Sequence, residues 1–99
     1  MPATKRANAR PNRNLIGARV CKARSEHPDQ LTQDQLAGRL AVLGVALDRV
    51  TIAKVETGLR CVYDYEVVAF AEALGTDVRW LLGLKDGSNA PKKKSGLLS

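Results

Sequence analysis

The sequence contains few of the residues that most often carry chemistry or cross-links. Its 99 residues include one histidine, two cysteines and one tryptophan. Cys21 and Cys61 belong to no Cys-x-x-Cys or Cys/His cluster, so we expect two reduced, partly buried thiols rather than a disulfide or a metal site. His27 stands beside Pro28 with no nucleophile positioned to use it, which argues against nucleophilic catalysis. We therefore expect no enzyme, no metal, no cofactor and no small-molecule ligand.

Long apolar runs are missing as well. No stretch approaches the length that is needed to cross a membrane. The charged start MPATKRANARPN is followed by no apolar segment of the kind that forms a secretory signal. We therefore expect a cytoplasmic protein that makes no contact with a membrane.

Acidic residues are absent from the first 13 positions, and positive charge gathers at both ends of the chain. Residues 14–83 hold eight basic and nine acidic side chains, so the formal net charge of +6 comes from the ends. The composition predicts a disordered basic arm over 1–13, one folded domain over 14–84 and a disordered basic tail over 85–99. Such ends suit a polyanion such as nucleic acid, although basic ends also serve as solubilising tails. The basic residues are Lys5, Arg6, Arg10 and Arg13 in the arm and Lys85, Lys92, Lys93 and Lys94 in the tail.

Ala, Leu and Val dominate the apolar residues, and no segment is a credible strand, so the sequence predicts an all-α domain. The clearest helix start is LTQDQL, where Thr32 and Gln35 can form a capping box and Leu31 and Leu36 flank it as a hydrophobic staple. Five short helices are expected over about 14–25, 32–43, 48–58, 64–74 and 77–82. At the start of the fourth of these, Tyr63 stands where Ser or Thr would cap, which leaves Asp64 as the expected cap. The expected core residues are Ile16, Val20, Ala23, Leu36, Leu40, Leu43, Ile52, Val55, Val67, Phe70, Ala71, Leu74, Trp80 and Leu81.

The segment DRVTIAKVETG, residues 48–58, has two different helical faces. Ile52 and Val55 point to one side, together with the methyl group of Thr51. The other side is small, partly methyl-bearing and cationic at two corners, whereas a solvated face usually carries long Glu, Lys and Gln side chains. An ordinary surface helix stays open as an alternative. The residues on this second side are Arg49, Val50, Ala53, Lys54 and Thr57.

Four pieces of the chain occur in the order of a known family. IGARVCKAR is followed by LTQDQLAGRL, then TIAKVETG, then YEVVAFAEALGTDVRWLLG. With Gln33 at the start of the second piece and Ile52, Glu56 and Gly58 in the third, residues 16–83 resemble the XRE family of helix-turn-helix domains, which includes Cro and the lambda-type repressors. The resemblance implies a five-helix, lambda-repressor-like bundle that contains a helix-turn-helix. The links SEHPDQ and AVLGVALDRV are longer than usual, so the angle of the helix over 48–58 is open.

The resemblance also implies roles for individual residues. The helix over 48–58 would enter the major groove of double-stranded DNA, where Arg49, Val50, Ala53 and Lys54 would meet base edges. Gln33, Thr57 and Arg60 would contact phosphates. Arg24 and Glu56 would form a structural ion pair, and Lys5, Arg6, Arg10 and Arg13 would form a DNA-contacting arm. Each side chain also has an ordinary structural or solvent role open to it.

The resemblance implies a sequence-specific transcriptional regulator of the repressor type that binds a two-fold DNA site as a homodimer. Such a protein is expected in the cytoplasm of a bacterial or phage-type system, at the nucleoid. The dimer surface is expected around 77–84, with Trp80, Leu82 and Leu84 as candidates, Trp80 being also a core candidate. The alternative is a helix-turn-helix module that binds a protein, such as a toxin or a larger regulator. The nearly neutral domain and the apolar run AVLGVAL support this alternative.

Overall fold

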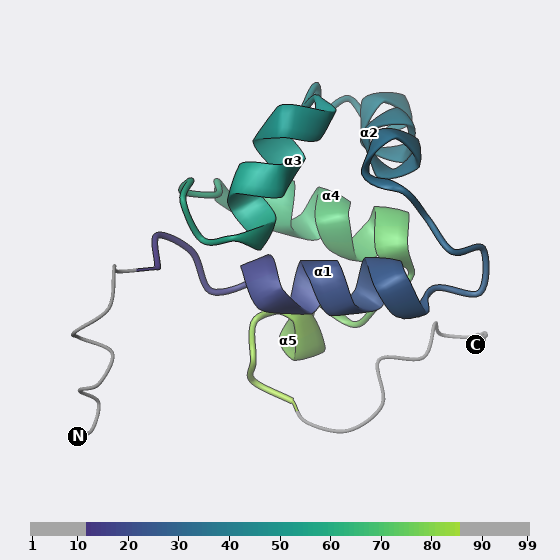
Figure 1. Cartoon of the computed structure of the whole chain (residues 1–99). Helices are drawn as coiled ribbons and strands as arrows, with labels where there is room; N and C mark the ends of the chain where they lie inside the picture. Colours follow the sequence, from purple (N-terminus) through teal and green to yellow (C-terminus); the bar gives the residue numbers. More distant parts are fainter. Residues whose placement is uncertain (1–11, 86–99) are drawn as a thin grey trace, which may run out of the picture.

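The structure, a computed structural model, describes residues 12–85, and this part of the chain folds entirely into helices and connecting segments. Figure 1 shows α1 across the front, α4 behind it, α2 and α3 above them, and α5 below. The helices are α1 (Gly17–Glu26), α2 (Gln33–Val42), α3 (Arg49–Glu56), α4 (Asp64–Leu74) and α5 (Val78–Leu81).

The helix contacts divide the molecule into two sides. Helix α4 packs against α1, α2 and α5, while α3 packs against α1 and α2. Helix α5 therefore lies on the opposite side of the α1–α4 layer from α3 (Figure 1). One core between these helices holds the expected apolar residues except Leu43 and Val67, and Val67 is half-buried against its edge. Leu36, Ile52 and Phe70 are fully buried, and Trp80 is 2% exposed.

The end of α2 differs from the sequence-based expectation. Leu43 was expected in the core, but α2 ends at Val42 and Leu43 is 38% exposed. Gly44 adopts a positive φ of 87°, which turns the chain back so that the Val45 amide donates to the Leu40 carbonyl at 2.9 Å. Val45 and Leu47 are then buried, so two residues of the long link fill the space that Leu43 was expected to fill.

Side-chain caps define two of the expected helix starts. The Thr32 hydroxyl accepts from the Gln35 amide at 3.0 Å, and the Gln35 side chain accepts from the Thr32 amide at 2.9 Å, so the capping box is confirmed. The Asp48 carboxylate accepts from the Thr51 amide at 2.8 Å and caps α3.

The expected cap of α4 is wrong. Asp64 is already the first residue of the helix, so its carboxylate cannot turn back onto the free amides of that first turn. The carboxylate of Glu66 instead accepts from the Tyr63 amide at 3.0 Å. This is the contact that a Glu at the third helical position makes in a capping box. It is present here although no Ser or Thr occupies the N-cap position.

The chain is held to α1 where it leaves α5. The guanidinium of Arg19 lies 4.9 Å from the centre of the Trp80 ring and donates to the Trp80 carbonyl at 2.8 Å. The same group donates to the Lys85 carbonyl at 3.3 Å. These contacts fix residues 80–85 on the side of α1 that faces away from α3.

Gly17 marks the closest approach of α1 to α3. A Cβ at this buried position would collide with the carbonyl oxygen of Val55, which is backbone and cannot swing aside. We predict that Gly17→Ala lowers the free energy of unfolding by about 1–3 kcal/mol, because the helices must move apart. Gly38→Ala is the matched control, since nothing lies within 4 Å of its Cβ. This control should stabilise the protein by about 1 kcal/mol through helix propensity. Urea denaturation measures both, and equal effects would contradict the close approach.

The ionisation of Asp77 is expected to make the stability of the fold depend on pH. Hydrogen bonds from Arg79, chiefly from its side chain and then its backbone amide, hold the pKa of the Asp77 carboxyl well below its ordinary value of 3.8, with a smaller contribution from Lys85. Because the folded pKa is depressed, this stabilisation is complete above the ordinary value and disappears as the pH falls through the folded pKa. We expect Tm to fall below about pH 4, and Asp77→Asn to flatten that decrease. An unchanged acid profile in the variant would rule out this role of Asp77.

Candidate nucleic-acid interface

Helix α3 has one buried face and one exposed face, as the helical period predicts. Ile52 and Val55 are completely buried. On the opposite side Val50 is 57% exposed, and the Arg49 side chain is 63% exposed. Ala53 is half-buried, whereas Lys54 and Thr57 are exposed. The structure therefore groups the predicted base-reading residues on one accessible face, with methyl groups between two cations.

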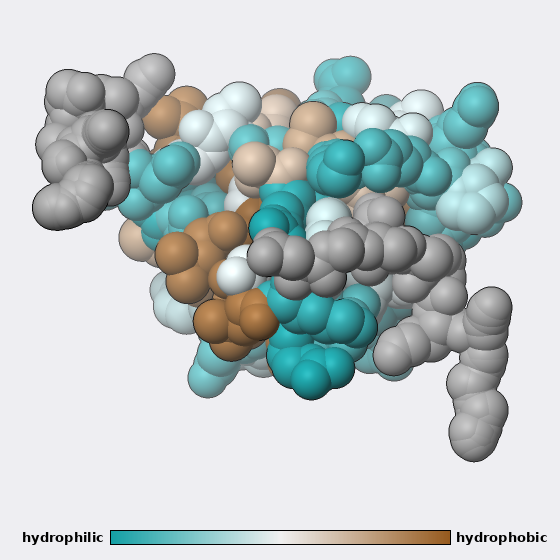
Figure 2. Space-filling model, turned by 90° about the horizontal axis from the view of Figure 1, so that it is seen from below, coloured by the Kyte–Doolittle hydropathy of each residue, from teal (hydrophilic) through white to brown (hydrophobic). Residues whose placement is uncertain are grey.

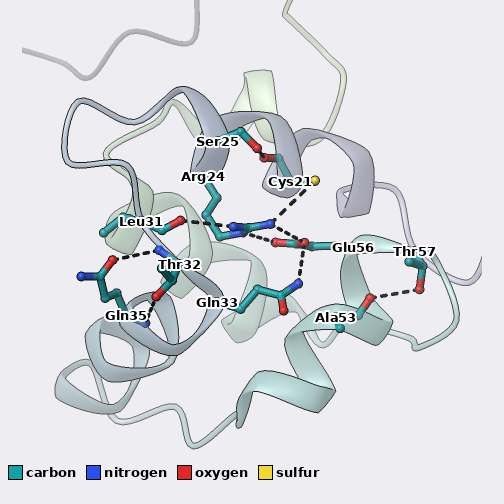
Figure 3. Close-up of polar contacts among 10 residues, drawn as sticks. All are labelled: Cys21, Arg24, Ser25, Leu31, Thr32, Gln33, Gln35, Ala53, Glu56 and Thr57. Carbon is teal, nitrogen blue, oxygen red and sulfur yellow. Dashed lines mark hydrogen bonds and ion pairs between the residues drawn. The ribbon is translucent and has the colours of Figure 1, made fainter.

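The far end of α3 is held by the side chain of Glu56. Its carboxylate accepts from Arg24 Nε at 2.7 Å and from Arg24 Nη2 at 3.0 Å, so the ion pair expected from the resemblance is present. Gln33 Nε2 donates to the same carboxylate at 3.0 Å. Figure 3 shows the three side chains converging from α1, α2 and α3. The hydrogen bonds with Glu56 and its negative charge raise the pKa of Arg24.

A further contact ties this network to the start of α2. Arg24 Nη1 donates to the carbonyl of Leu31 at 3.2 Å, directly before the Thr32 cap (Figure 3). One arginine of α1 therefore holds the last turn of α3 and the entry to α2 together. The side chains of Arg24 and Glu56 are only 18% and 6% exposed, so solvent screens their interaction weakly.

The three predicted phosphate-contacting residues have different surroundings. Gln33 is half-buried and bonded to Glu56, as described above. The hydroxyl of exposed Thr57 donates to the carbonyl of Ala53 at 3.0 Å. Arg60 forms an ion pair with Glu66 at 3.0 Å, and its own side chain is 28% exposed. Arg60 therefore already has a structural task, because it neutralises a carboxylate that is only 4% exposed.

Asn14 is an organising residue that we did not single out from the sequence. Its Oδ1 accepts from the amides of Ile16 and Gly17 at 3.1 and 2.7 Å, which holds the chain where it enters α1. Its Nδ2 donates to the carbonyls of Val55 and Arg60 at 3.1 and 2.8 Å. Asn is a favourable residue at a helix start, and that signal was available. The bonds to residues more than forty positions away had no sequence signal.

The predicted arm is described only at its last residues. The Arg13 amide donates to the Gly58 carbonyl at 2.9 Å, so the chain enters α1 alongside the end of α3. Gly58, with a positive φ of 81°, leaves room there for the side chain of Asn12. Residues 12 and 13 thus belong to the folded body, ahead of the boundary expected at 14. The predicted arm residues Lys5, Arg6 and Arg10 and the tail residues Lys92, Lys93 and Lys94 lie outside the described residues.

The remaining expectations concern metals, thiols and membranes. Within residues 12–85, no group of three or more His, Cys, Asp or Glu is arranged to hold a metal ion. Cys21 and Cys61 are free thiols, and Cys61 is exposed rather than partly buried, because it lies in the link after α3. No helix in this part of the chain has the length and apolar character needed to span a membrane.

A comparison of the chain with protein-family models, curated proteins and solved structures finds no significant match in any of the three.

The Glu56 network gives a direct test of how α3 is held. Arg24→Ala would leave a nearly buried carboxylate without its cation, and we predict a loss of about 3 kcal/mol in the free energy of unfolding. Lys22→Ala is the matched control on the same helix, because its i,i+4 pair with Glu26 is about half exposed on both sides. This control should cost less than about 0.5 kcal/mol. Thermal and urea denaturation measure the stability of both variants. Equally small losses for Arg24→Ala and Lys22→Ala would contradict a stabilising role of the Glu56 network.

Proposed function

We propose that this protein is a sequence-specific DNA-binding transcriptional regulator of the repressor type, with α2 and α3 as a helix-turn-helix in a lambda-repressor-like bundle. In this proposal α3 lies in the major groove. The single observation that carries the proposal is the exposed face of α3, where Arg49 and Lys54 flank the small apolar residues Val50 and Ala53. The resemblance of residues 16–83 to the XRE family supports the same assignment.

The chemistry of this face suits the edges of base pairs. The guanidinium of Arg49 can donate two hydrogen bonds to O6 and N7 of a guanine. Val50 and Ala53 can contact thymine methyl groups, and their small size lets the helix backbone approach the groove floor. Lys54 adds a cation near the opposite end of the helix, within reach of a base or a phosphate. The proposed phosphate contacts are Thr57, Gln33 and Arg60. Gln33 and Arg60 would use the N–H groups that are not bonded to Glu56 and Glu66.

One such domain reads only a few base pairs, so the proposed form on DNA is a homodimer on a two-fold site. The proposed dimer surface is the side that carries α5. Figure 2 shows hydrophobic residues gathered on this face of the molecule. Leu84 is 75% exposed and Leu82 is half-buried, so both can contribute to it. Trp80 is 2% exposed and belongs to the core, so it has almost no surface to offer.

A second candidate function rests on the end of α2. Val42 is 86% exposed and Leu43 is 38% exposed, next to a shallow pocket that Gly38 and Val42 help to line. These residues form an apolar surface in a part of the chain that is nearly neutral, which favours a protein partner. The alternative proposal is a helix-turn-helix module that binds a protein such as a toxin or a larger regulator.

Salt separates the two candidates. Groove binding with several phosphate contacts releases condensed counterions, so we expect the affinity for a selected site to fall by roughly 10³-fold or more between 50 and 200 mM salt. A complex made through Val42 and Leu43 should respond weakly, because apolar contact is not screened. Isothermal titration over this salt range gives the slope, and a flat profile for DNA would argue for the protein-binding module.

Base reading by α3 has its own test. Arg49→Ala should reduce the preference for guanine at one position of the site by roughly tenfold or more, with little change at the other positions. Lys22→Ala is the control, since it removes an exposed cation from α1 whose ion-pair partner is Glu26 on the same helix. Selection of bound sequences from a random DNA pool measures both variants. A motif that is identical for wild type and Arg49→Ala would remove Arg49 from the base-reading set.

A further inference from the structure

Asp34 is a negative charge on the surface that is proposed to meet DNA. It is the second residue of α2, directly after Gln33, and its side chain is 75% exposed. Its Oδ1 lies 4.0 Å from Nε of Arg49, so the two side chains form a link between α2 and α3. Both residues line an open pocket between these helices.

An acid in this place opposes binding to any DNA. The phosphate backbone repels a carboxylate, and most of the affinity of such proteins comes from cations that neutralise phosphates. The ordinary reason for an acid in the first turn of a helix is the helix dipole, which contributes about 0.3–1 kcal/mol. The start of α2, however, already has a complete capping box from Thr32 and Gln35. The dipole favours an acid in the first turn of α2, but it does not require that the acid face Arg49.

The neighbouring charged groups have other partners. Arg24 lines the same pocket, but it bonds to Glu56 and to the Leu31 carbonyl. Asp48 precedes Arg49 and caps α3 through the Thr51 amide. Among the interactions described for residues 12–85, the contact with Asp34 is the one ion pair that Arg49 makes.

We propose that Asp34 is a positioning residue for Arg49 and thereby determines which base α3 accepts. A guanidinium has two edges that can each make paired hydrogen bonds. When the Nε edge faces the Asp34 carboxylate, the two Nη groups point away from α2 and are free to bind O6 and N7 of one guanine. Without that partner, Arg49 can rotate to a phosphate or to a neighbouring base. This inference rests on the proposed function and concerns the same face of α3.

The environment explains why a long contact in the free protein matters on DNA. An exposed pair at 4.0 Å is worth little in water, so it leaves Arg49 free to move before binding. In the groove, water is displaced and the effective dielectric constant falls, which strengthens the attraction between the two side chains. At a site with guanine, Arg49 satisfies both Asp34 and the base. At a site without guanine, the Asp34 carboxylate still repels the phosphates, and no Arg49–guanine contact offsets this repulsion. The affinity for such sites therefore falls more than the affinity for sites with guanine.

The test compares five full-length proteins, including the Asp34→Asn/Arg49→Ala double variant, in selection from a random DNA pool. Kd measurements follow on the selected site and on the same site with its guanine replaced. The variants are Asp34→Asn, Arg49→Ala and the control Asp64→Asn, which removes an exposed first-turn acid from α4. We expect Asp34→Asn to bind unrelated DNA several-fold more tightly and to lose roughly tenfold of the preference for guanine at the Arg49 position. The Asp64→Asn motif should equal that of wild type. In the Arg49→Ala background, Asp34→Asn should cause no further loss of preference at that position.

The outcomes separate the inference from the proposed function. If Arg49→Ala changes the motif and Asp34→Asn does not, DNA reading by α3 stands and the positioning role of Asp34 is wrong. The same conclusion follows if Asp34→Asn changes the affinity for all sequences equally, since a helix-dipole role would do that. If wild type selects no motif even at low salt, the proposed function itself fails.

Discussion

The carboxylate of Glu56 is where three helices are joined, and the position of α3 depends on it. An isolated helix of eight residues has little stability in water, so the direction of α3 must come from its tertiary contacts. Ile52 and Val55 give it an anchored face, but apolar contact alone allows a helix to roll or slide. The charge-assisted bonds from Arg24 and the amide of Gln33 have fixed directions, and they remove that freedom. A weakly exposed pair of this kind defines geometry more than it adds net stability.

Backbone contacts complete this arrangement at the other side of α3. Asn14 bonds to two amides at the start of α1 and to two carbonyls near the end of α3, while Gly17 allows the two backbones to meet. The Arg13–Gly58 bond then carries the entering chain past the same point. A residue with a side chain at 17, or a residue other than Asn at 14, would move the exposed face of α3 relative to α2. The residues of α3 that are proposed to touch DNA are thus oriented in part by Asn14 and Gly17, which are not proposed to touch it.

Local signals predicted the helices well, whereas long-range contacts had to come from elsewhere. Thr32 and Gln35, and the Asp48 cap, follow from nearest neighbours in the sequence, and both are present. The prediction that Leu43 lies in the core was wrong because the helical spacing was extended one residue beyond the end of α2. The chain turns at Gly44, and Val45 and Leu47 are buried instead. The prediction that Asp64 caps α4 was wrong because Asp64 is already the first helical residue, and Glu66 accepts from the amide of Tyr63, the residue before it. The Arg24–Glu56 pair was expected only from the family resemblance, since two residues 32 positions apart share no local signal. The exposed side of α3 followed from the helical period, but its partner Asp34 did not.

The contacts of Arg19 with Trp80 and Lys85 also determine how the molecule can be handled. They fix the point where the chain leaves the folded body, on the side of the α1–α4 layer opposite α3. Anything joined beyond Lys85, such as a fusion partner or an affinity tag, begins its path from that far side. A surface or partner that holds the protein close to Lys85 would therefore lie on the side opposite α3 and leave α3 open to the solution. Contact at that point would also cover the exposed side chain of Leu84, so a protein held there and a free one would differ in the surface that is proposed for the dimer.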